Sequence, residues 1–254
     1  MPEDQPLPWV RMDAHEHQRM AEHEEWYWWH LARKAIVHRL IRRHAPASPR
    51  ILDVGCGTGA TTASLLCFGP VIGLDIGEAA LRRARQRNLT VTRSNAVHLP
   101  LRNESFDVVV ALDVFEHLDD DVAAIRSIRN TLAPDGVLIA TVPAYEFLWS
   151  RHDIALGHKR RYVRGRLIQA LEAGGLKVEV CSYVMAAILP VAAVIRLADR
   201  ILPGRSAERQ SDYPAVPTFL NTLLTHVSAF DGRLIEWFNL PFGLSVLAVA
   251  RRTD

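Results

Sequence analysis

The sequence has few of the residues that hold small secreted or metal-stabilised domains together. Its 254 residues include three cysteines, and their spacing fits neither a zinc site nor an even set of disulfides: Cys56, Cys67 and Cys181. We therefore expect reduced thiols and a cytoplasmic protein. The acidic, polar N-terminus has no apolar segment of the kind that makes a secretory signal, which fits that location.

Strong charge of one sign and long apolar runs are also missing. The 30 Lys and Arg residues against 28 Asp and Glu residues give a formal net charge of +2, which argues against a dedicated nucleic-acid-binding protein. Residues 183–195 carry no charge, but a membrane span needs about 20 apolar residues. We expect this segment to be a buried hairpin over the active site or an interfacial segment, with membrane contact at most peripheral. No oligomeric state follows from these patterns.

A glycine-rich turn lies between an apolar strand and a helix, and the rest of the chain is arranged around it. Residues 51–54 are apolar, residues 60–66 suit a helix, and three glycines lie between them: Gly55, Gly57 and Gly59. Such a turn lets a ligand approach bare main chain, and the helix N-terminus adds unpaired N–H groups. The pattern also fits a dinucleotide fingerprint. Asp53, two residues before the first glycine, would repel a pyrophosphate and attract a ligand that carries an ammonium group.

Strands and helices alternate after this turn. We expect strands at residues 51–54, 71–75, 89–93, 106–112, 137–142, 176–183 and 244–250. We expect helices at residues 14–43, 60–66, 78–87, 119–132, 165–173 and 218–238. Strands separated by helices at this spacing predict an α/β fold with a doubly wound, mostly parallel seven-stranded sheet and helices on both faces.

Several motifs together resemble the class I S-adenosylmethionine-dependent methyltransferases. The first motif of that family reads like Asp53-Val-Gly-Cys-Gly-Thr-Gly59, and residues 113–118 resemble its Glu-His-Leu element. Ser94-Asn95-Ala96 stands where the family has Gly-Asp-Ala, with an amide in place of the acid. S-adenosylmethionine carries an ammonium group and a sulfonium but no phosphate, in agreement with Asp53. The resemblance covers residues 50–183 and 244–250 and implies this cofactor.

The expected cofactor site combines the turn with residues that follow later strands. Asp75 ends the second strand, where an acid can accept both ribose hydroxyls of an adenosine; this fits NAD as well as S-adenosylmethionine. The resemblance implies that Asn95 reaches the adenine amino group and that Asp113 lies near the sulfonium. By analogy, Trp28, Trp29 and Arg33 close over the cofactor. The complete expected set is Asp53, Gly55, Gly57, Gly59, Asp75, Ile76, Asn95, Ala96, Asp113, Val114, Trp29 and Arg33.

Two histidines are the expected catalytic residues, with His117 as the first candidate base and His152 as the second. Histidine titrates near neutral pH and can take a proton from an acceptor hydroxyl or amine. A role for His117 as a wall of the cofactor pocket is equally open. His15, His17 and His23 are expected on a solvated, charged helix face, because they close no ligand set, and no metal site is predicted.

A run of positive side chains follows the fifth expected strand, namely His152, His158, Lys159, Arg160, Arg161, Arg164 and Arg166. These side chains could hold a phosphate or carboxylate of the acceptor, although a solvated basic face is the commoner outcome. The aromatic cluster at residues 26–29 cannot place all four rings in one core, so some are expected to line a pocket or a partner.

The combined expectation is a Rossmann-like methyltransferase that moves the sulfonium methyl group to an O, N or C nucleophile of a small-molecule acceptor. Anionic, hydrophobic and lipid-linked molecules remain alternative acceptors. Two alternative functions also remain, an NAD(P)-dependent oxidoreductase and a non-catalytic Rossmann-like binding protein. The chain is expected to divide into an N-terminal helical cap (residues 1–49), a cofactor-binding core (50–183), a helical insertion or lid (184–240) and a final strand (241–254).

Overall fold

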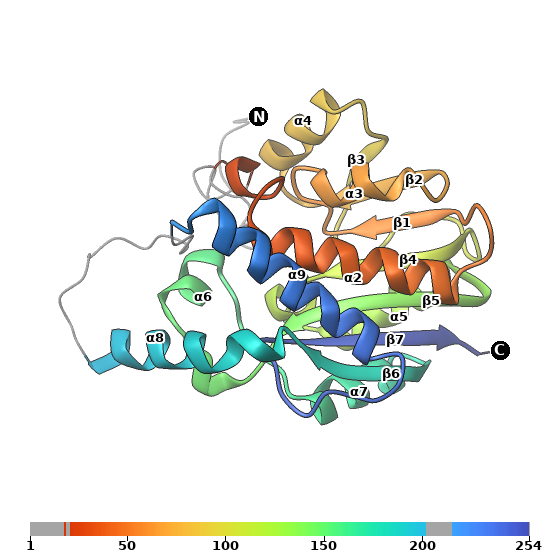
Figure 1. Cartoon of the computed structure of the whole chain (residues 1–254). Helices are drawn as coiled ribbons and strands as arrows, with labels where there is room; N and C mark the ends of the chain where they lie inside the picture. The colour runs from red at the N-terminus through yellow and green to blue at the C-terminus, as the bar shows by residue number, and fades with distance from the viewer. Residues whose placement is uncertain (1–17, 19–20, 202–214, 254) are drawn as a thin grey trace.

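The computed structural model describes residues 18, 21–201 and 215–253, and it places one seven-stranded sheet at the centre of the molecule (Figure 1). The strands are β1 (Ile51–Val54), β2 (Val71–Asp75), β3 (Val91–Arg93), β4 (Phe106–Leu112), β5 (Leu132–Pro143), β6 (Leu176–Val184) and β7 (Ser245–Arg252). Their order across the sheet is β3-β2-β1-β4-β5-β7-β6. β7 runs antiparallel to both of its neighbours, whereas β1 to β5 pair in parallel. The predicted doubly wound, mostly parallel sheet is confirmed.

Helices cover both faces of this sheet. They are α2 (Trp28–His44), α3 (Ala60–Leu65), α4 (Glu78–Gln86), α5 (Asp121–Thr131), α6 (Arg151–Leu156), α7 (Arg164–Ala173), α8 (Leu189–Ile201) and α9 (Thr218–Leu234). Short 3-10 turns are η1 (Phe115–His117), η2 (Glu146–Leu148) and η3 (Ala186–Ile188). α2 and α9 lie side by side over one face, and α5 and α7 cover the other (Figure 1). Because it is covered on both faces, central β4 is almost wholly apolar, as a buried parallel strand should be.

Pro134-Asp135-Gly136 predicts a turn ahead of the fifth expected strand, but these residues are part of β5. Phe106 of β4 pairs with Leu132, and Val108 pairs with Val137, so several residues of β5 lie opposite one residue of β4. Asp135 takes a positive φ of 60° within this bulge. The turn residues therefore bend the strand without ending its pairing, because β4 offers hydrogen-bond partners on both sides of the bulge.

The N-terminal helix is interrupted where the sequence predicts a continuous helical run. Within the described residues, a turn occupies residues 24–26, Tyr27 is extended, and α2 begins at Trp28. Asn221 of α9 explains the break: its side chain accepts the Trp28 N–H at 2.9 Å and donates to the Trp26 carbonyl at 2.7 Å. A tertiary contact therefore ends one helix and starts the next. His15 and His17 lie outside the described residues.

Of the two expectations for the charge-free segment at residues 183–195, a buried hairpin or an interfacial segment, the buried hairpin is wrong. Only the first residues of the segment are buried, and α8 then exposes Val191, Val194 and Ile195 by 61%, 68% and 53%. The physical reason is that α9 packs along α2 rather than along α8. None of the described helices combines the length and the apolarity that a bilayer crossing requires.

Asn221→Ala tests the contact that holds α9 against the N-terminal segment. The change removes both side-chain hydrogen bonds and leaves a buried backbone N–H at Trp28 without its partner. We expect a loss of about 1–3 kcal/mol in the free energy of unfolding, measured by urea denaturation. The exposed neighbour Thr222 provides the matched control, and Thr222→Ala should cost less than about 0.5 kcal/mol. Equal effects of the two changes would contradict the docking role of Asn221.

Candidate functional site

The turns that follow β1, β2 and β4 meet at the carboxyl edge of the sheet. The predicted glycines all take positive φ, which is 73° at Gly55, 54° at Gly57 and 89° at Gly59. Gly55 lies so close to Val114, after β4, that a Cβ atom there would approach Val114 Cγ2 to 2.6 Å. The first glycine is therefore required both by its backbone angle and by this close approach. Open parallel sheets bind ligands at such an edge.

Asp75 connects two of these turns. Its carboxylate accepts the N–H of Gly57 at 2.8 Å and the N–H of Gly77 at 2.7 Å. The residue is half-buried, and Ile76 beside it is half-buried as well. The sequence placed Asp75 at the ribose, and the structure puts its carboxylate at the mouth of the glycine turn.

Asp53 is buried beneath the turn. Its carboxylate accepts the Thr62 hydroxyl of α3 at 2.6 Å, so it is directed at the helix that follows the glycines. Burial raises the pKa of Asp53 to about 6, and the nearby Asp75 carboxylate adds to that rise, while the Thr62 hydrogen bond and Arg33 oppose it.

Asn95 and Ala96 lie beyond β3 at the outer end of the same edge. Asn95 is exposed, and its amide oxygen accepts the Val97 N–H at 3.0 Å, which stabilises the turn. Ala96 is half-buried and packs against the main core. The amide oxygen that the sequence assigned to adenine therefore already accepts one hydrogen bond, and its second lone pair remains.

The helix α2 reaches the site through Arg33. The Arg33 guanidinium forms an ion pair with Asp113 at the end of β4, and it also lies over the Trp29 ring at 4.3 Å. Asp113, which has a φ of 55°, accepts a further hydrogen bond from Thr141. The structure therefore brings Trp29, Arg33 and Asp113 together, and Trp29 also packs against the buried cluster that contains Trp28.

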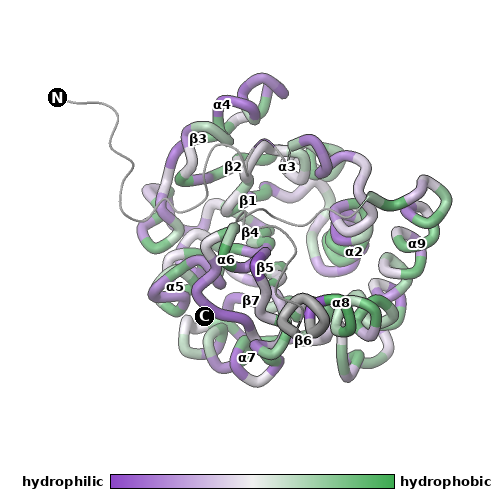
Figure 2. The backbone as a smooth tube through the Cα atoms, turned by 90° about the vertical axis from the view of Figure 1, so that its left-hand side faces the viewer, coloured by the Kyte–Doolittle hydropathy of each residue, from purple (hydrophilic) through white to green (hydrophobic). Residues whose placement is uncertain are grey.

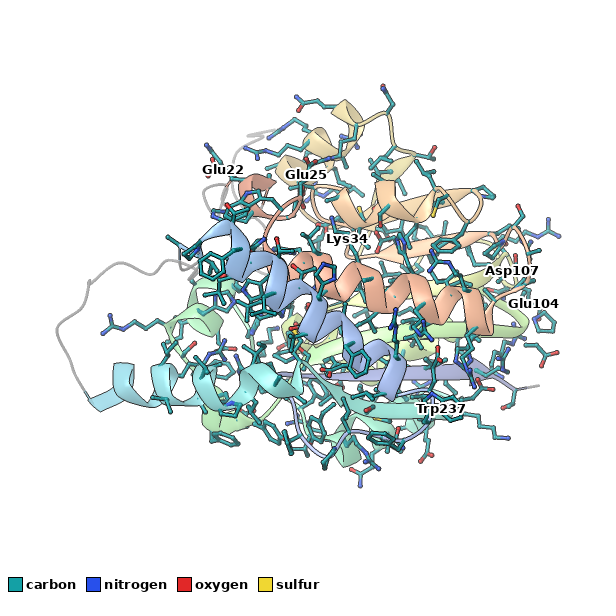
Figure 3. The ribbon with its side chains drawn as sticks, in the orientation of Figure 1. Glu22, Glu25, Lys34, Glu104, Asp107 and Trp237 are labelled. Atoms are coloured by element: carbon teal, nitrogen blue, oxygen red, sulfur yellow. The ribbon has the colours of Figure 1, made fainter. Side chains whose placement is uncertain are left out.

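The sequence did not reveal that Glu24 is part of this site. Glu24 is buried rather than on a solvated face: it accepts a hydrogen bond from Thr58 within the glycine turn and pairs with Arg87 at 2.9 Å. Burial raises its pKa. Lys34 of α2 donates to the Glu24 carbonyl at 2.9 Å, which ties the segment around Glu25 to that helix (Figure 3). No spacing pattern marked Glu24, because its partners lie far along the chain.

Three histidine rings, those of His117, His152 and His158, lie near one another in the segments that follow β4 and β5. His158 lies between the two predicted bases: its ring centroid is 4.8 Å from that of His117 and 6.4 Å from that of His152. Burial lowers the pKa of His117 to about 3, and that of His152 to about 3. His30 of α2 is also buried, and burial holds its pKa well below the usual range.

Glu116 lies beside these rings and is wholly buried. Neither of its carboxylate oxygens has a hydrogen-bond partner within the described part of the chain. Burial raises its pKa well above the usual range, and the Asp113 charge raises it further.

The predicted anion-binding run is largely paired within the protein. Lys159 pairs with Asp119, Arg160 pairs with Asp121 at 3.3 Å, and Arg161 pairs with Asp153 at 2.8 Å, while the Arg166 guanidinium lies over the Tyr162 ring. Three of the cationic side chains that were predicted to bind an anion are therefore already paired with carboxylates of the protein. The sequence could not show this, because it does not say which carboxylates face the run.

Comparison with known proteins agrees with this arrangement. A model of the methyltransferase domain family matches residues 52–140. A Mycolicibacterium smegmatis protein named "Probable S-adenosylmethionine-dependent methyltransferase" is 32% identical over 161 residues, which is 61% of this chain and 62% of that protein. A ubiquinone biosynthesis O-methyltransferase of Haemophilus ducreyi is 32% identical over 101 residues, 35% of this chain and 43% of that enzyme. The chain thus spans less than two thirds of either relative.

Solved structures share the fold at low identity. An S-adenosylmethionine-dependent methyltransferase of Thermotoga maritima is 18% identical with a TM-score of 0.58, covering 93% of this chain and 97% of that one. An N-methyltransferase of Bradyrhizobium japonicum in complex with S-adenosyl-L-homocysteine is 16% identical with a TM-score of 0.56, covering 94% and 99%.

The strand order separates this fold from that of the dinucleotide-binding oxidoreductases. Those enzymes have the order 3-2-1-4-5-6, whereas this sheet inserts the antiparallel β7 between β5 and β6. Together with the glycine turn, this order agrees with the match of residues 52–140 to the methyltransferase domain family.

Proposed function

We propose that the protein transfers the sulfonium methyl group of S-adenosylmethionine to an O, N or C nucleophile of a small acceptor. The observation that carries the proposal is the position of Asp113, which lies between the glycine turn and the histidines. Gly55 contacts Val114, the residue after Asp113, and Glu116 and His117 follow in η1. The sulfonium is already an activated leaving group, so the protein has mainly to position the two reactants.

The residues of the turn fit this cofactor. Gly55 is exposed although its neighbours are buried, so its main chain can meet a ligand. We assign the ribose hydroxyls to Asp75, because each of its oxygens accepts one backbone N–H and keeps a second lone pair. The buried Asp53 carboxylate supplies negative charge for the ammonium end, and Asp113 with Arg33 and Trp29 closes the side that faces the acceptor.

We propose a hydrophobic or lipid-linked acceptor that enters from the side of α8 and α9. α8 exposes Val191, Val194 and Ile195, α9 exposes Phe219, Leu223 and Phe230 among polar residues, and hydrophobic stretches occur along both helices (Figure 2). α8 is tied to η2 by a 2.9 Å hydrogen bond from Arg196 to the Leu148 carbonyl, and α6 with His152 follows directly. Trp237, just past α9, is 86% exposed (Figure 3). Residues 184–240 would then act as a lid with peripheral membrane contact, and residues 1–49 as the cap.

The three free thiols are consistent with a cytoplasmic location for this reaction.

Among the histidines, we assign the role of base to His152. His117 is held by a hydrogen bond to the Gly157 backbone and packs edge-on against His158, whereas His152 lies on the side of α8.

Asp75→Ala tests the cofactor assignment. Loss of the charge-assisted hydrogen bonds to the ribose should weaken S-adenosylmethionine binding at least about tenfold in calorimetry. The wild-type protein should bind S-adenosylmethionine and not NAD. The exposed Glu172 on α7 offers the matched control, and Glu172→Ala should keep wild-type affinity. Thermal unfolding must accompany the measurement, because Asp75 also holds Gly57 and Gly77. A folded Asp75→Ala protein with unchanged affinity would remove Asp75 from the site.

Asp53→Asn separates stability from cofactor binding. Because burial raises the pKa of Asp53 from 3.8 to about 6, its contribution to stability is complete below pH 3.8 and is lost as the pH rises through about 6. Between pH 4 and pH 7 the variant should gain roughly 1–3 kcal/mol relative to wild type, measured by urea denaturation. Its affinity for S-adenosylmethionine should fall. A stability difference that stays constant over this pH range would contradict the buried charge.

The acceptor class can be tested with methyl-labelled S-adenosylmethionine and a cell extract. A hydrophobic acceptor places the label in the organic phase after solvent extraction. His152→Ala should lower the transfer by about 10²–10⁴ with cofactor affinity intact. His44→Gln, at the far end of α2, is the control and should transfer normally. Label found only in a water-soluble product would reject the hydrophobic acceptor while leaving methyl transfer established.

A further inference from the structure

Three metal-ligand side chains meet beside Asp113. Glu116 and His117 come from η1, and His158 comes from the loop after α6. One ligand atom from each lies within 4.8 Å of the other two, and His158 Nε2 is 4.0 Å from Glu116 Oε1. We propose that Glu116, His117 and His158 together bind one divalent transition-metal ion.

The unpartnered Glu116 carboxylate is the first support for a cation here. The side chain is wholly buried, and both oxygens lack a hydrogen-bond partner among the described residues. A buried polar group without a partner is costly, and buried charges are normally paired or bound to metals. A cation between Glu116 and the two rings satisfies both oxygens.

The outer hydrogen bonds of the two histidines are the second support. His158 Nδ1 lies 2.8 Å from Asp153 Oδ1, so the opposite nitrogen, Nε2, is directed toward Glu116. Arg161 fixes the Asp153 carboxylate with bonds of 2.8 and 3.0 Å. His117 is hydrogen-bonded to the Gly157 backbone. Metal-bound histidines almost always use their second nitrogen in this way, toward a carboxylate or a backbone carbonyl.

The balance of charge around the site also favours a cation. Asp113 is neutralised by Arg33, Asp153 by Arg161, and Lys159 pairs with Asp119. Each of these ion pairs leaves little net charge. In contrast, Glu116 has no cationic side chain within hydrogen-bond distance among the described residues, and His158 Nε2 is 4.0 Å from its Oε1. A divalent ion would compensate it.

The ligand set indicates the kind of metal. Two imidazoles and one carboxylate suit zinc or iron(II), and such sites keep open positions for further ligands. Ligands of a tetrahedral zinc ion lie about 3.3 Å apart, so the three side chains would close inward by on the order of 1 Å each. Torsions of the Glu116 side chain and tilting of the rings can supply that movement.

An open position would face an oxygen of the acceptor, a role that depends on the methyl transfer proposed above. A hydroxyl bound there would lose its proton more readily, and His152, the base proposed above, would accept that proton. The oxygen then forms the bond to the methyl carbon, the carbon–sulfur bond breaks, and its electron pair stays on S-adenosylhomocysteine. His117 would serve as a ligand rather than as the base that the sequence suggested.

Metal binding can be measured without acceptor or cofactor. Untagged protein is treated with a chelator, dialysed, and titrated with Zn²⁺ in a calorimeter and with Co²⁺ in a spectrophotometer. We expect one ion per chain, with visible Co²⁺ bands typical of nitrogen and oxygen ligands. Glu116→Gln and His158→Ala should each weaken Zn²⁺ binding at least about 100-fold, beyond the 10–100-fold typical of outer partners.

His226→Ala is the matched control, because His226 is exposed on α9, and it should bind Zn²⁺ as wild type does. Circular dichroism checks the fold, and Glu116→Gln, which keeps the shape of the side chain, decides the question if His158→Ala does not fold. No binding to wild type, or binding that survives Glu116→Gln, would overturn the proposal. Since S-adenosylmethionine affinity is measured separately, a failed metal titration leaves the proposed methyl transfer standing.

Discussion

The carboxylate of Asp75 is the contact on which the cofactor side of the structure depends. It accepts the N–H of Gly57, in the turn after β1, and the N–H of Gly77, before α4. Because β1 and β2 are parallel neighbours, both turns leave the sheet at the same edge. One side chain therefore sets the spacing between two stretches of bare main chain. The same oxygens keep lone pairs, so in the cofactor assignment proposed above one carboxylate would both hold the two turns and bind the ribose.

In the segments that follow β4 and β5, buried ion pairs between distant parts of the chain position the side chains. Arg33 of α2 holds Asp113 at the end of β4, and Arg161 holds Asp153 of α6, which in turn orients His158. Such pairs need good geometry to offset the loss of hydration. What looks like a positive surface in the sequence thus becomes an internal framework, and both carboxylate oxygens of Glu116 lack a hydrogen-bond partner among the described residues.

The sequence predicted features that depend on neighbours along the chain. The apolar run of β4 was located to the residue, and the glycine turn, Asp75 and the order of the strands were found as expected, whereas α6 and α8 were not among the predicted helices. Three features were predicted wrongly: the unbroken N-terminal helix, the turn before β5 and the burial of α8. In each case a partner from elsewhere in the chain decides the outcome. Asn221 interrupts the helix, β4 continues its pairing past the bulge, and α9 packs on α2 instead of α8.

The sequence by itself determined the class of fold, the glycine turn and the acidic residue that ends β2, because hydrophobic period and turn chemistry act over a few residues. Only the tertiary structure decided that β7 enters antiparallel between β5 and β6, that Glu24 is buried against Thr58, and that His158 lies between His117 and His152. These contacts join residues far apart in the chain. Their formation depends on packing, desolvation and charge pairing, none of which is encoded in local spacing.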